Sequence, residues 1–336
     1  MLYTHQYPDW TKFRYDSKKV TNALGQVRFA EGRLAGITSI LENGNEEDIF
    51  VSDIVTTYAI DGEKISHENI TAPDENGMSI IDKYHQFMET QDESSDTFEE
   101  SHLFKWQSTL SGNHRAGYRK VESYIQDNGG KTVFAGPGPE RVQQEMTNFI
   151  TWFNISQTDA VIKAAIAQFW FLTIRPFEHS NGKIARMLTN MLLYHSNGTG
   201  MILYSINEQI LQDRENYFRI LSSAQAGNGD LTEWILWFLK TMLRAIRKRE
   251  EALNTQILSA RFKNKKNMEK LPPRSREIVD AILSGALPQP FNVKEVAAHT
   301  GTSHDSALRD IQKLIEFKLA SPTKKGGRST RYSLIL

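Results

Sequence analysis

Residues 175–186 of this 336-residue chain, RPFEHSNGKIAR, are of types that could bind a ligand or take part in a reaction. Its Ser-Asn-Gly triplet at 180–182 is turn-forming and falls at the predicted start of a helix. The first N–H groups of a helix have no partner within the helix and, with the helix dipole, favour a bound anion. Lys183 and Arg186 lie three residues apart and therefore share one face of the first helical turn. The pattern predicts a phosphate-binding cradle, although an ordinary helix cap with two solvated cations fits the same residues.

Two predicted helices must position this stretch. Residues 160–174 (AVIKAAIAQFWFLTI) are apolar on nearly every face, so we expect the central buried helix of the protein there. Asp159 is suited to cap its start, and Pro176 ends it. A second helix is predicted over residues 181–195. The candidate stretch therefore begins as a loop between two helices.

The rest of residues 1–260 is predicted to be mainly helical. Helices are expected over residues 17–42, 50–60, 140–154, 207–225 and 231–260. The helix over 50–60 is ended by Asp61-Gly62, and the acidic, serine-rich residues 91–100 are expected to form a loop or linker. Two short strands at 120–125 and 131–135, joined by Asp-Asn-Gly-Gly, predict a β-hairpin.

The composition limits the class of protein. A length of 336 residues suits two or three domains, and 40 Lys and Arg balance 40 Asp and Glu. The chain has no cysteine, which excludes disulfides, cysteine–zinc sites and thiol catalysis. No apolar run reaches the ~18–20 residues of a membrane helix, and the first ten residues lack the apolar stretch of a signal peptide. We therefore expect a cytoplasmic protein with no membrane partner.

The last part of the chain differs from the rest in charge. Residues 261–336 hold 15 Lys and Arg against 7 Asp and Glu, whereas residues 1–260 hold 25 against 33. This basic region suggests DNA as a partner, and a basic surface that docks on the acidic remainder is the alternative. Helices near 273–283, 293–300 and 306–317, followed by a hairpin, predict a winged helix-turn-helix. The residues predicted to contact DNA are Arg309, Lys313, Lys324, Lys325, Arg328 and Arg331. Winged helices also bind proteins, so the fold leaves this alternative open.

The stretch 175–186 resembles the motif His-Pro-Phe-x-(Asp/Glu)-Gly-Asn-Gly-Arg-x-x-Arg of the Fic (Fido) family of protein adenylyltransferases. The likeness extends to the preceding helix, the predicted hairpin and residues 205–239. An N-terminal helical module and a C-terminal winged helix are familiar in one bacterial branch of that family. The resemblance implies a mainly α fold with three parts: a helical module over 1–100, a Fic core with a hairpin flap over 101–260, and a winged helix with a basic linker over 261–336.

The resemblance also implies a nucleotide site with ATP as the bound nucleotide. Carried over position by position, the binding residues are Phe177, Ser180, Asn181, Gly182, Lys183 and Arg186, with Tyr217 in the region that lies near the adenine. Arg175 occupies the position of the general-base histidine, and an arginine that stays protonated cannot accept a proton. His179 occupies the position of the acidic magnesium ligand, where it is a poor ligand for a hard cation. His179 acting as a displaced base is the alternative.

A second family feature is matched upstream. Many members carry an inhibitory helix with the pattern (Ser/Thr)-x-x-x-Glu-(Gly/Asn), whose glutamate pairs with the second motif arginine. Residues 57–62 match it, with Thr57, Asp61 and Gly62 at the defining positions and aspartate in place of glutamate. The resemblance implies an Asp61–Arg186 contact, and a simple helix end at Asp61-Gly62 is compatible with it. The hairpin is implied to add a segment of a target protein as an extra strand, with a plain surface hairpin as the alternative.

Three functions follow from these expectations. The first is a degenerate Fic protein that binds a nucleotide or phosphate with weak or no transfer. The second is an active transferase that attaches AMP from ATP to a hydroxyl of a target protein, whose identity the sequence does not give. The third is a DNA-binding regulator that uses residues 261–336. A homodimer is plausible from the resemblance.

Overall fold

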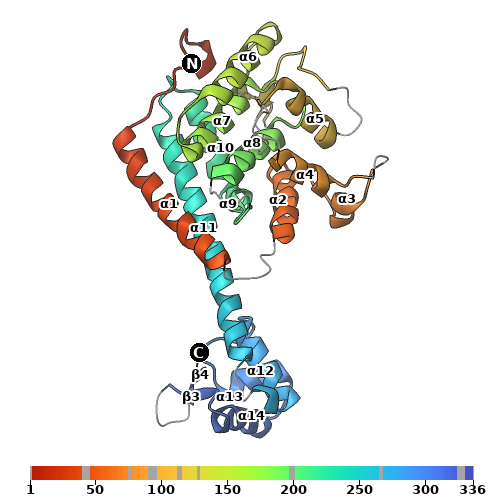
Figure 1. Ribbon diagram of the computed structural model, residues 1–336, viewed down its shortest axis with the longest axis vertical. Helices are drawn as coiled ribbons and strands as arrows, with labels where there is room; N and C mark the ends of the chain where they lie inside the picture. Colours follow the sequence, from red (N-terminus) through yellow and green to blue (C-terminus); the bar gives the residue numbers. More distant parts are fainter. Residues whose placement is uncertain are drawn as a thin grey trace. The chain divides into compact units, whose positions relative to one another are not determined.

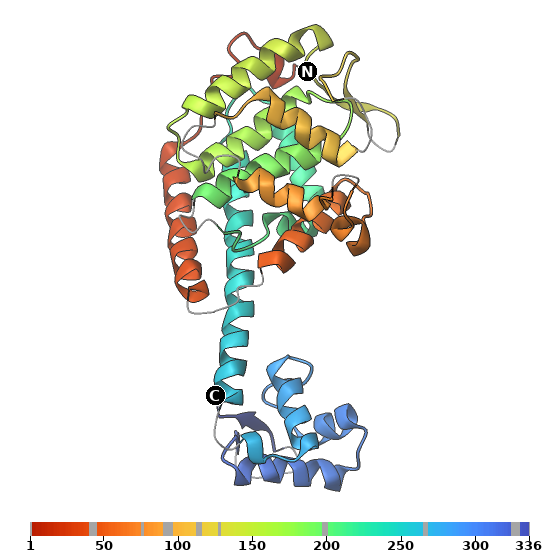
Figure 2. The ribbon, with the colours of Figure 1, turned by 45° about the vertical axis from the view of Figure 1, so that its right-hand side comes forward.

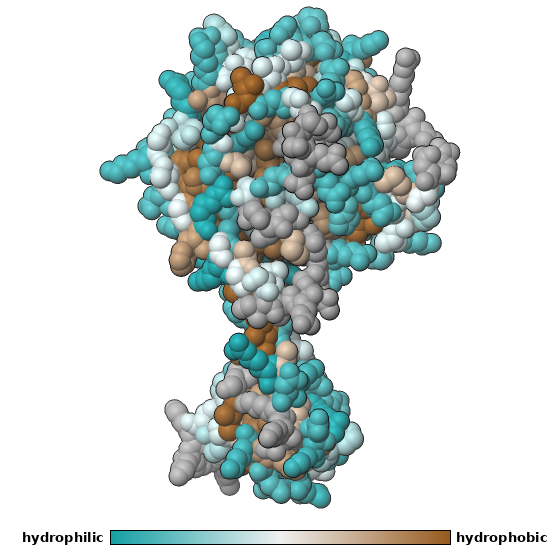
Figure 3. Space-filling view, viewed as in Figure 1, coloured by the Kyte–Doolittle hydropathy of each residue, from teal (hydrophilic) through white to brown (hydrophobic). Residues whose placement is uncertain are grey.

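The computed structural model describes residues 2–39, 46–74, 77–89, 97–111, 116–126, 129–196, 201–264, 268–323 and 330–335. The chain divides into two compact units, Met1–Arg249 and Glu250–Leu336. On the face shown in Figure 3, polar side chains cover most of the surface of each unit. No helix in the described part of the chain is long and apolar enough to cross a membrane.

The first unit is built from helices with one small hairpin (Figure 1). Its elements are η1 (Thr4–Gln6), α1 (Ser17–Thr38), α2 (Glu46–Ile60), α3 (His67–Thr71), α4 (Ile80–Glu89), α5 (Glu100–Ser111), β1 (Tyr124–Gln126), β2 (Thr132–Ala135), α6 (Pro139–Ile155), α7 (Ala160–Ile174), α8 (Asn181–Ser196), α9 (Ile206–Gln212), α10 (Arg214–Gln225) and α11 (Thr232–Lys263), which continues into the second unit.

Helix α7 is the centre of the first unit, as its apolar sequence predicts. Nearly every one of its side chains is buried, and its longest interface is with α8, which is buried over most of its length as well. Figures 1 and 2 show α7 and α8 surrounded by the other helices of the unit. The Asp159 carboxylate caps α7 by accepting a hydrogen bond from the Val161 N–H at 2.9 Å. The loop between α7 and α8 is thus held at both ends by core helices.

The predicted hairpin is present but shorter than expected. Strands β1 and β2 pair antiparallel, with an irregularity in register between Ile125 and Gln126. Two of the predicted turn residues, 127 and 128, lie outside the described residues. The expected helix over 207–225 is two helices, because the chain breaks at Asp213 between α9 and α10. The sequence patterns also missed α3 and α4. Residues 91–96 of the expected acidic linker lie outside the described residues.

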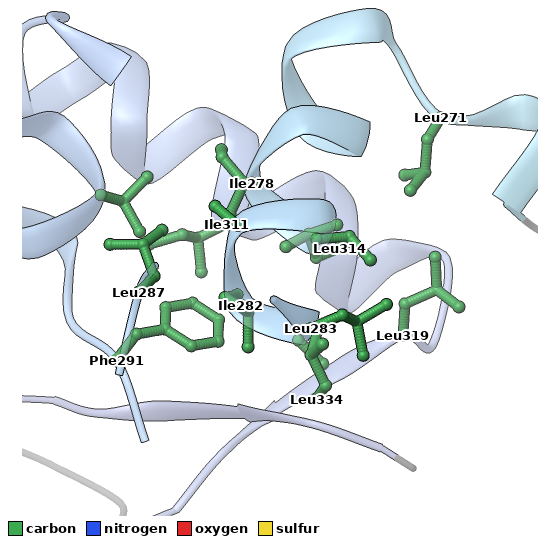
Figure 4. Close-up of a cluster of buried hydrophobic side chains, with 14 of the residues drawn as sticks. Leu271, Ile278, Ile282, Leu283, Leu287, Phe291, Ile311, Leu314, Leu319 and Leu334 are labelled. Atoms are coloured by element: carbon green, nitrogen blue, oxygen red, sulfur yellow. The ribbon is translucent and has the colours of Figure 1, made fainter. Parts of the chain in front are cut away.

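The second unit holds η2 (Met268–Lys270), α12 (Pro273–Leu283), α13 (Val293–Thr300), α14 (His304–Glu316), β3 (Ala320–Pro322) and β4 (Tyr332–Leu334). The two strands pair antiparallel. A separate core lies between the helices and the hairpin, and Figure 4 shows Ile282, Phe291, Ile311 and Leu334 as part of it. A bidentate ion pair between Arg274 and the buried Asp310 fixes α12 to α14.

Candidate functional site

The loop between α7 and α8 is fixed from below by two residues of the candidate stretch. Phe177 is fully buried, and its ring lies against those of Tyr118 and Phe171, so it anchors the loop in the core. The buried Asn181 side chain accepts a hydrogen bond from the Phe177 N–H at 3.0 Å and donates one to the Phe177 carbonyl at 2.7 Å. This pair of hydrogen bonds to the backbone closes the loop at the first turn of α8. The backbone of the loop is therefore fixed to the core at Phe177 and Asn181.

A third residue, Arg119, holds the same loop from the other side. Its buried guanidinium donates from Nε to the Arg175 carbonyl at 2.7 Å and from Nη2 to the Ile174 carbonyl at 3.3 Å, and its N–H donates to the Pro176 carbonyl. The carbonyls of Ile174 and Arg175 lie at the end of α7, where carbonyls have no partner in the helix, so Arg119 acts as a side-chain cap. Arg175 itself adopts a left-handed conformation with φ 50°. The sequence analysis missed Arg119 because it lies 56 residues before Arg175 and belongs to no motif.

A cavity of about 440 Å³ opens above the start of α8. Predicted site residues that line it are Asp61, Arg175, His179, Ser180, Asn181, Gly182, Arg186 and Tyr217. The remaining walls come from β1, from Glu178, from Leu172 of α7, and from Arg214, Phe218 and Leu221 of α10. The structure therefore brings together most of the residues that the sequence singled out. Among the described residues, Phe177 and Lys183 do not line the cavity, and neither do Thr57 and Gly62.

The Arg186 guanidinium is buried and held by the segment 57–63. Its Nε donates to the Thr57 hydroxyl at 2.6 Å and its Nη2 to the Thr57 carbonyl at 2.8 Å, and Nη2 lies 2.9 Å from the Asp61 carboxylate. A Cβ at Gly182 would lie 2.8 Å from Asp61 Oδ1, so only glycine lets this carboxylate approach the start of α8. The implied Asp61–Arg186 contact is confirmed. Gly62 follows in the left-handed region, with φ 83°, which suits the end of α2.

Lys183 makes a separate contact with the same segment. Its ammonium group lies 2.5 Å from Glu63 Oε1 and 4.6 Å from the centre of the Tyr58 ring, and its side chain is only 3% exposed. The predicted cation is therefore neither solvated nor aimed into the cavity. Sequence analysis missed Glu63, which lies just beyond the inhibitory-type pattern and 120 residues before Lys183.

Helix α2 is held in place by a buried carboxylate in its middle. Asp53 accepts hydrogen bonds from Tyr84 of α4 at 2.7 Å, from Asn190 of α8 at 2.5 Å, and from Ser205 and Asn207 at 2.6 and 2.8 Å. Burial raises the pKa of the Asp53 carboxyl, and these four donors oppose that rise. The network joins α2, which ends next to Asp61, to α8, which carries Arg186.

Arg175 points its guanidinium toward the cavity wall formed by the hairpin. Its Nε donates to the Ser123 hydroxyl at 2.9 Å. Burial, followed by the charge of Arg119, lowers the pKa of the Arg175 guanidinium, and Asp61 opposes this. Arg175 makes no ion pair with a carboxylate of the described ranges. An arginine nevertheless keeps its proton at ordinary pH, so this group supplies positive charge and cannot act as a base.

Helix α10 supplies the remaining wall. Tyr217 is buried against the rings of Trp234 and Trp237, and burial raises its pKa to about 12, with the Arg186 charge in opposition. Arg214 is exposed; its Nε donates to the Ile60 carbonyl at 2.7 Å and its guanidinium lies over the Phe218 ring. The sequence patterns did not single out Arg214 or Ser123, since each reaches the site only through the packing of α10 and the hairpin.

Two family models match the chain. One, described as the Fic/DOC family, covers residues 97–193, and a domain of unknown function, DUF4172, covers residues 3–73. Residues 97–193 are therefore similar to the Fic/DOC family. The matched region includes α7, the loop and most of α8, which are the elements that position the cavity.

Curated relatives of the Fic domain are distant. The chain is 26% identical over 157 residues to the protein adenylyltransferase fic-1 of Caenorhabditis elegans, over 44% of this chain and 28% of the relative. It is also 26% identical over 133 residues to the protein adenylyltransferase Fic of Nematostella vectensis, over 38% of this chain and 28% of the relative. The match thus spans about a quarter of each relative's own length, 28%.

Solved structures share the fold. A Fic family protein from Desulfovibrio desulfuricans G20 matches with a TM-score of 0.60 at 17% identity, over 95% of this chain and 96% of that one. Fic-1 (residues 134–508) from C. elegans matches with a TM-score of 0.54 at 20% identity, over 71% of this chain and 74% of that one. The chain therefore has a mainly helical Fic fold with small hairpins.

Proposed function

We propose that this chain is a degenerate Fic-domain protein, which binds a phosphate-bearing nucleotide in the cavity at α8 and transfers part of it weakly or not at all. The observation that carries the proposal is Arg175. Its guanidinium faces the cavity at the position where the family motif has the histidine base. ATP is the nucleotide that the family relationship favours.

The chemistry of transfer explains why this residue matters. For AMP transfer, the oxygen of a target hydroxyl attacks the α-phosphorus, the bond to the leaving diphosphate breaks, and the hydroxyl proton must go to a base. Arg175 cannot take that proton, and loss of a general base alone reduces the rate by about 10²–10⁴-fold. His179 is exposed at the rim and would be the alternative acceptor in a chain that retains full transfer activity.

The contact of Asp61 with Arg186 supports an inhibitory role for residues 57–62. The carboxylate lies beside Gly182, where an incoming phosphate would approach the N–H groups at the start of α8. A nucleotide whose terminal phosphate pairs with Arg186 must first displace this carboxylate. We therefore propose that binding is weak in the unmodified chain and becomes stronger when the Asp61 charge is removed.

Calorimetric titration with ATP and incubation with labelled ATP test the proposal together. We expect the Asp61→Asn variant to bind ATP and the unmodified chain to leave target hydroxyls almost unlabelled. The triple variant Arg175→His, His179→Asp, Lys183→Arg, which restores the family motif at these positions, should gain labelling. Labelling of the unmodified chain at a rate similar to the triple variant, lost in Arg186→Ala, would show an active transferase instead. An absence of ATP binding to Asp61→Asn at millimolar ATP would contradict the nucleotide site itself.

A second candidate function, DNA binding, is favoured by the second unit. We propose that α13, Gly301 and α14 form a helix-turn-helix and that β3 and β4 form its wing. Gly301 has φ 64°, which suits the tight turn, and Arg309 and Lys313 are exposed on α14 opposite the buried Ile311. Arg331 is exposed beside Glu295, at 3.2 Å. Lys324, Lys325 and Arg328 lie outside the described residues, so their place in the wing stays a prediction.

Salt dependence tests this candidate. Binding to duplex DNA should weaken as salt rises, because each phosphate contact releases counterions and contributes a slope of about −0.9 in a plot of log K against log salt. Replacing Lys324, Lys325 and Arg328 with alanine should flatten that slope. Exposed Lys64→Ala in the first unit is the matched charge control and should leave it unchanged. A slope unaffected by the triple change would argue against the wing. A homodimer stays a prediction.

A further inference from the structure

The cavity at α8 holds more positive charge than the nearby carboxylates neutralise. Three arginines line it, and among the described residues only Arg186 has an ion-pair partner, Asp61. Arg175 and Arg214 make no ion pair within the described ranges of the chain. The cavity therefore presents two cations to any ligand that enters, and one of them, Arg175, is half-buried.

The residues present do not fit the magnesium ion that the family motif implies. His179 stands at the acidic position, and an imidazole is a poor ligand for a cation that prefers oxygen. The carboxylates that line the cavity are Asp61, which is paired with Arg186, and the exposed Glu178. A divalent cation next to the phosphates would also be repelled by the guanidiniums of Arg175 and Arg214. The site thus has an imidazole in place of an acidic metal ligand and adds the fixed cations Arg175 and Arg214.

We infer that the cavity binds its nucleoside triphosphate free of magnesium, with Arg175 and Arg214 supplying the positive charge that a metal ion would supply. This inference rests on the proposed nucleotide site and specifies the form of ligand that the site takes.

Arg175 is suited to this role by position and chemistry. A guanidinium presents a planar fork of donors that matches two phosphate oxygens. One donor, Nε, already bonds Ser123 of the hairpin segment, and the Arg175 backbone is held by Arg119, so the side chain is positioned before a ligand arrives. Burial and the nearby Arg119 disfavour the charge of Arg175, and a bound anion would relieve that cost. A fully ionised triphosphate relieves it more than the magnesium complex, which has lost half of its negative charge.

Calorimetric titration of the full chain with ATP, once in excess EDTA and once in excess MgCl₂, tests the inference. The Asp61→Asn variant is used as the background so that the resident carboxylate does not mask binding. We expect ATP to bind at least about tenfold more tightly in EDTA than in MgCl₂. Inorganic triphosphate in EDTA should compete with ATP, because the inferred contacts are to phosphate oxygens.

Variants of Arg175 and a matched control complete the test. On the same background, Arg175→Ala should weaken ATP binding in EDTA by about ten- to hundredfold, as expected for a lost hydrogen bond to a charged group. Arg175→Lys should retain part of the affinity, since it keeps the charge and loses the fork. Arg219→Ala removes an exposed arginine of the same helix as Arg214 that does not line the cavity, and it should have no effect. Circular dichroism confirms that each variant is folded.

The outcomes separate this inference from the proposed function. ATP binding that requires magnesium, or that Arg175→Ala leaves unchanged in EDTA, overturns the inference and leaves a nucleotide site in place. An absence of binding under both conditions overturns the nucleotide site and the inference together.

Discussion

The cavity at the start of α8 has two walls of opposite electrostatic character. On one wall, the segment 57–63 brings Asp61 to Arg186, and outside the cavity it also brings Glu63 to Lys183, so both cations of α8 are paired. On the other wall, Arg175 and Arg214 face the cavity without ion pairs in the described residues. The first wall keeps motif cations occupied, whereas the second offers charge to a ligand. The comparison shows that a cation at a motif position in the sequence is not necessarily available to bind a ligand, because it can already be paired in the fold.

The largest expected effect comes from breaking the first wall at Arg186. Arg186→Ala removes a buried guanidinium and leaves Asp61 and the Thr57 carbonyl without their donor. Breaking a buried ion pair costs about 3–5 kcal/mol, and we expect the lower end because Asp61 is 22% exposed. Chemical denaturation measures this loss. The exposed Arg219→Ala variant is the control and should change the free energy of unfolding by less than about 0.5 kcal/mol; a similar value for both would mean that the pair does not stabilise the fold.

The second prediction concerns the loop between α7 and α8, which holds Arg175. Asn181→Ala removes both hydrogen bonds to the Phe177 backbone, in a buried environment. We expect a loss of about 2–3 kcal/mol in the free energy of unfolding, because a buried N–H and a buried carbonyl are left unpaired. Asn148→Ala, on the exposed face of α6, removes a bond of the same amide type at the surface and should cost little. Equal effects of the two changes would contradict the role of Asn181 in fixing the loop.

The third prediction tests whether the first wall blocks the ligand. Asp61→Asn keeps the shape of the side chain and removes its charge, so Arg186 is no longer held by an ion pair. We expect the affinity for ATP to rise about tenfold, which corresponds to about 1.4 kcal/mol. Isothermal titration calorimetry in EDTA measures it. Asp61→Glu keeps the charge and should keep the weak binding. An affinity that Asp61→Asn leaves unchanged would refute the blocking role.

The smallest expected effect comes from the second ion pair of the segment 57–63, between Glu63 and Lys183. Glu63 is 52% exposed, and an exposed partner adds only about 0–1 kcal/mol to stability. Lys183 does not line the cavity and keeps its contact with the Tyr58 ring when Glu63 is neutralised. Glu63→Gln should therefore change the ATP affinity by less than about twofold on titration, within the effect of a weak surface interaction. An effect as large as that of Asp61→Asn would mean that Lys183 also binds the ligand.

Much of the fold could be predicted from local patterns. The all-round apolar sequence of α7 placed it in the core with the correct ends, and the turn residues at 180–182 placed the start of α8. The missed helices α3 and α4 are short, and α9 and α10 were merged because their helical periodicity continues across Asp213. Short elements and breaks of this kind depend on packing against neighbours, which local periodicity does not report.

The candidate site, too, was only partly predictable from local sequence. The sequence by itself determined which chemical groups stand in the loop: a guanidinium at Arg175, an imidazole at His179, and the small residues that open α8. Only the tertiary structure decided which of these groups face the cavity and which are already paired. Glu63 and Arg119 reach the site from positions 120 and 56 residues away from their partners, and Asp61 approaches Arg186 because Gly182 leaves room for it. Charges far apart in the chain interact only once folding brings them together, so their pairing is a property of packing and not of spacing.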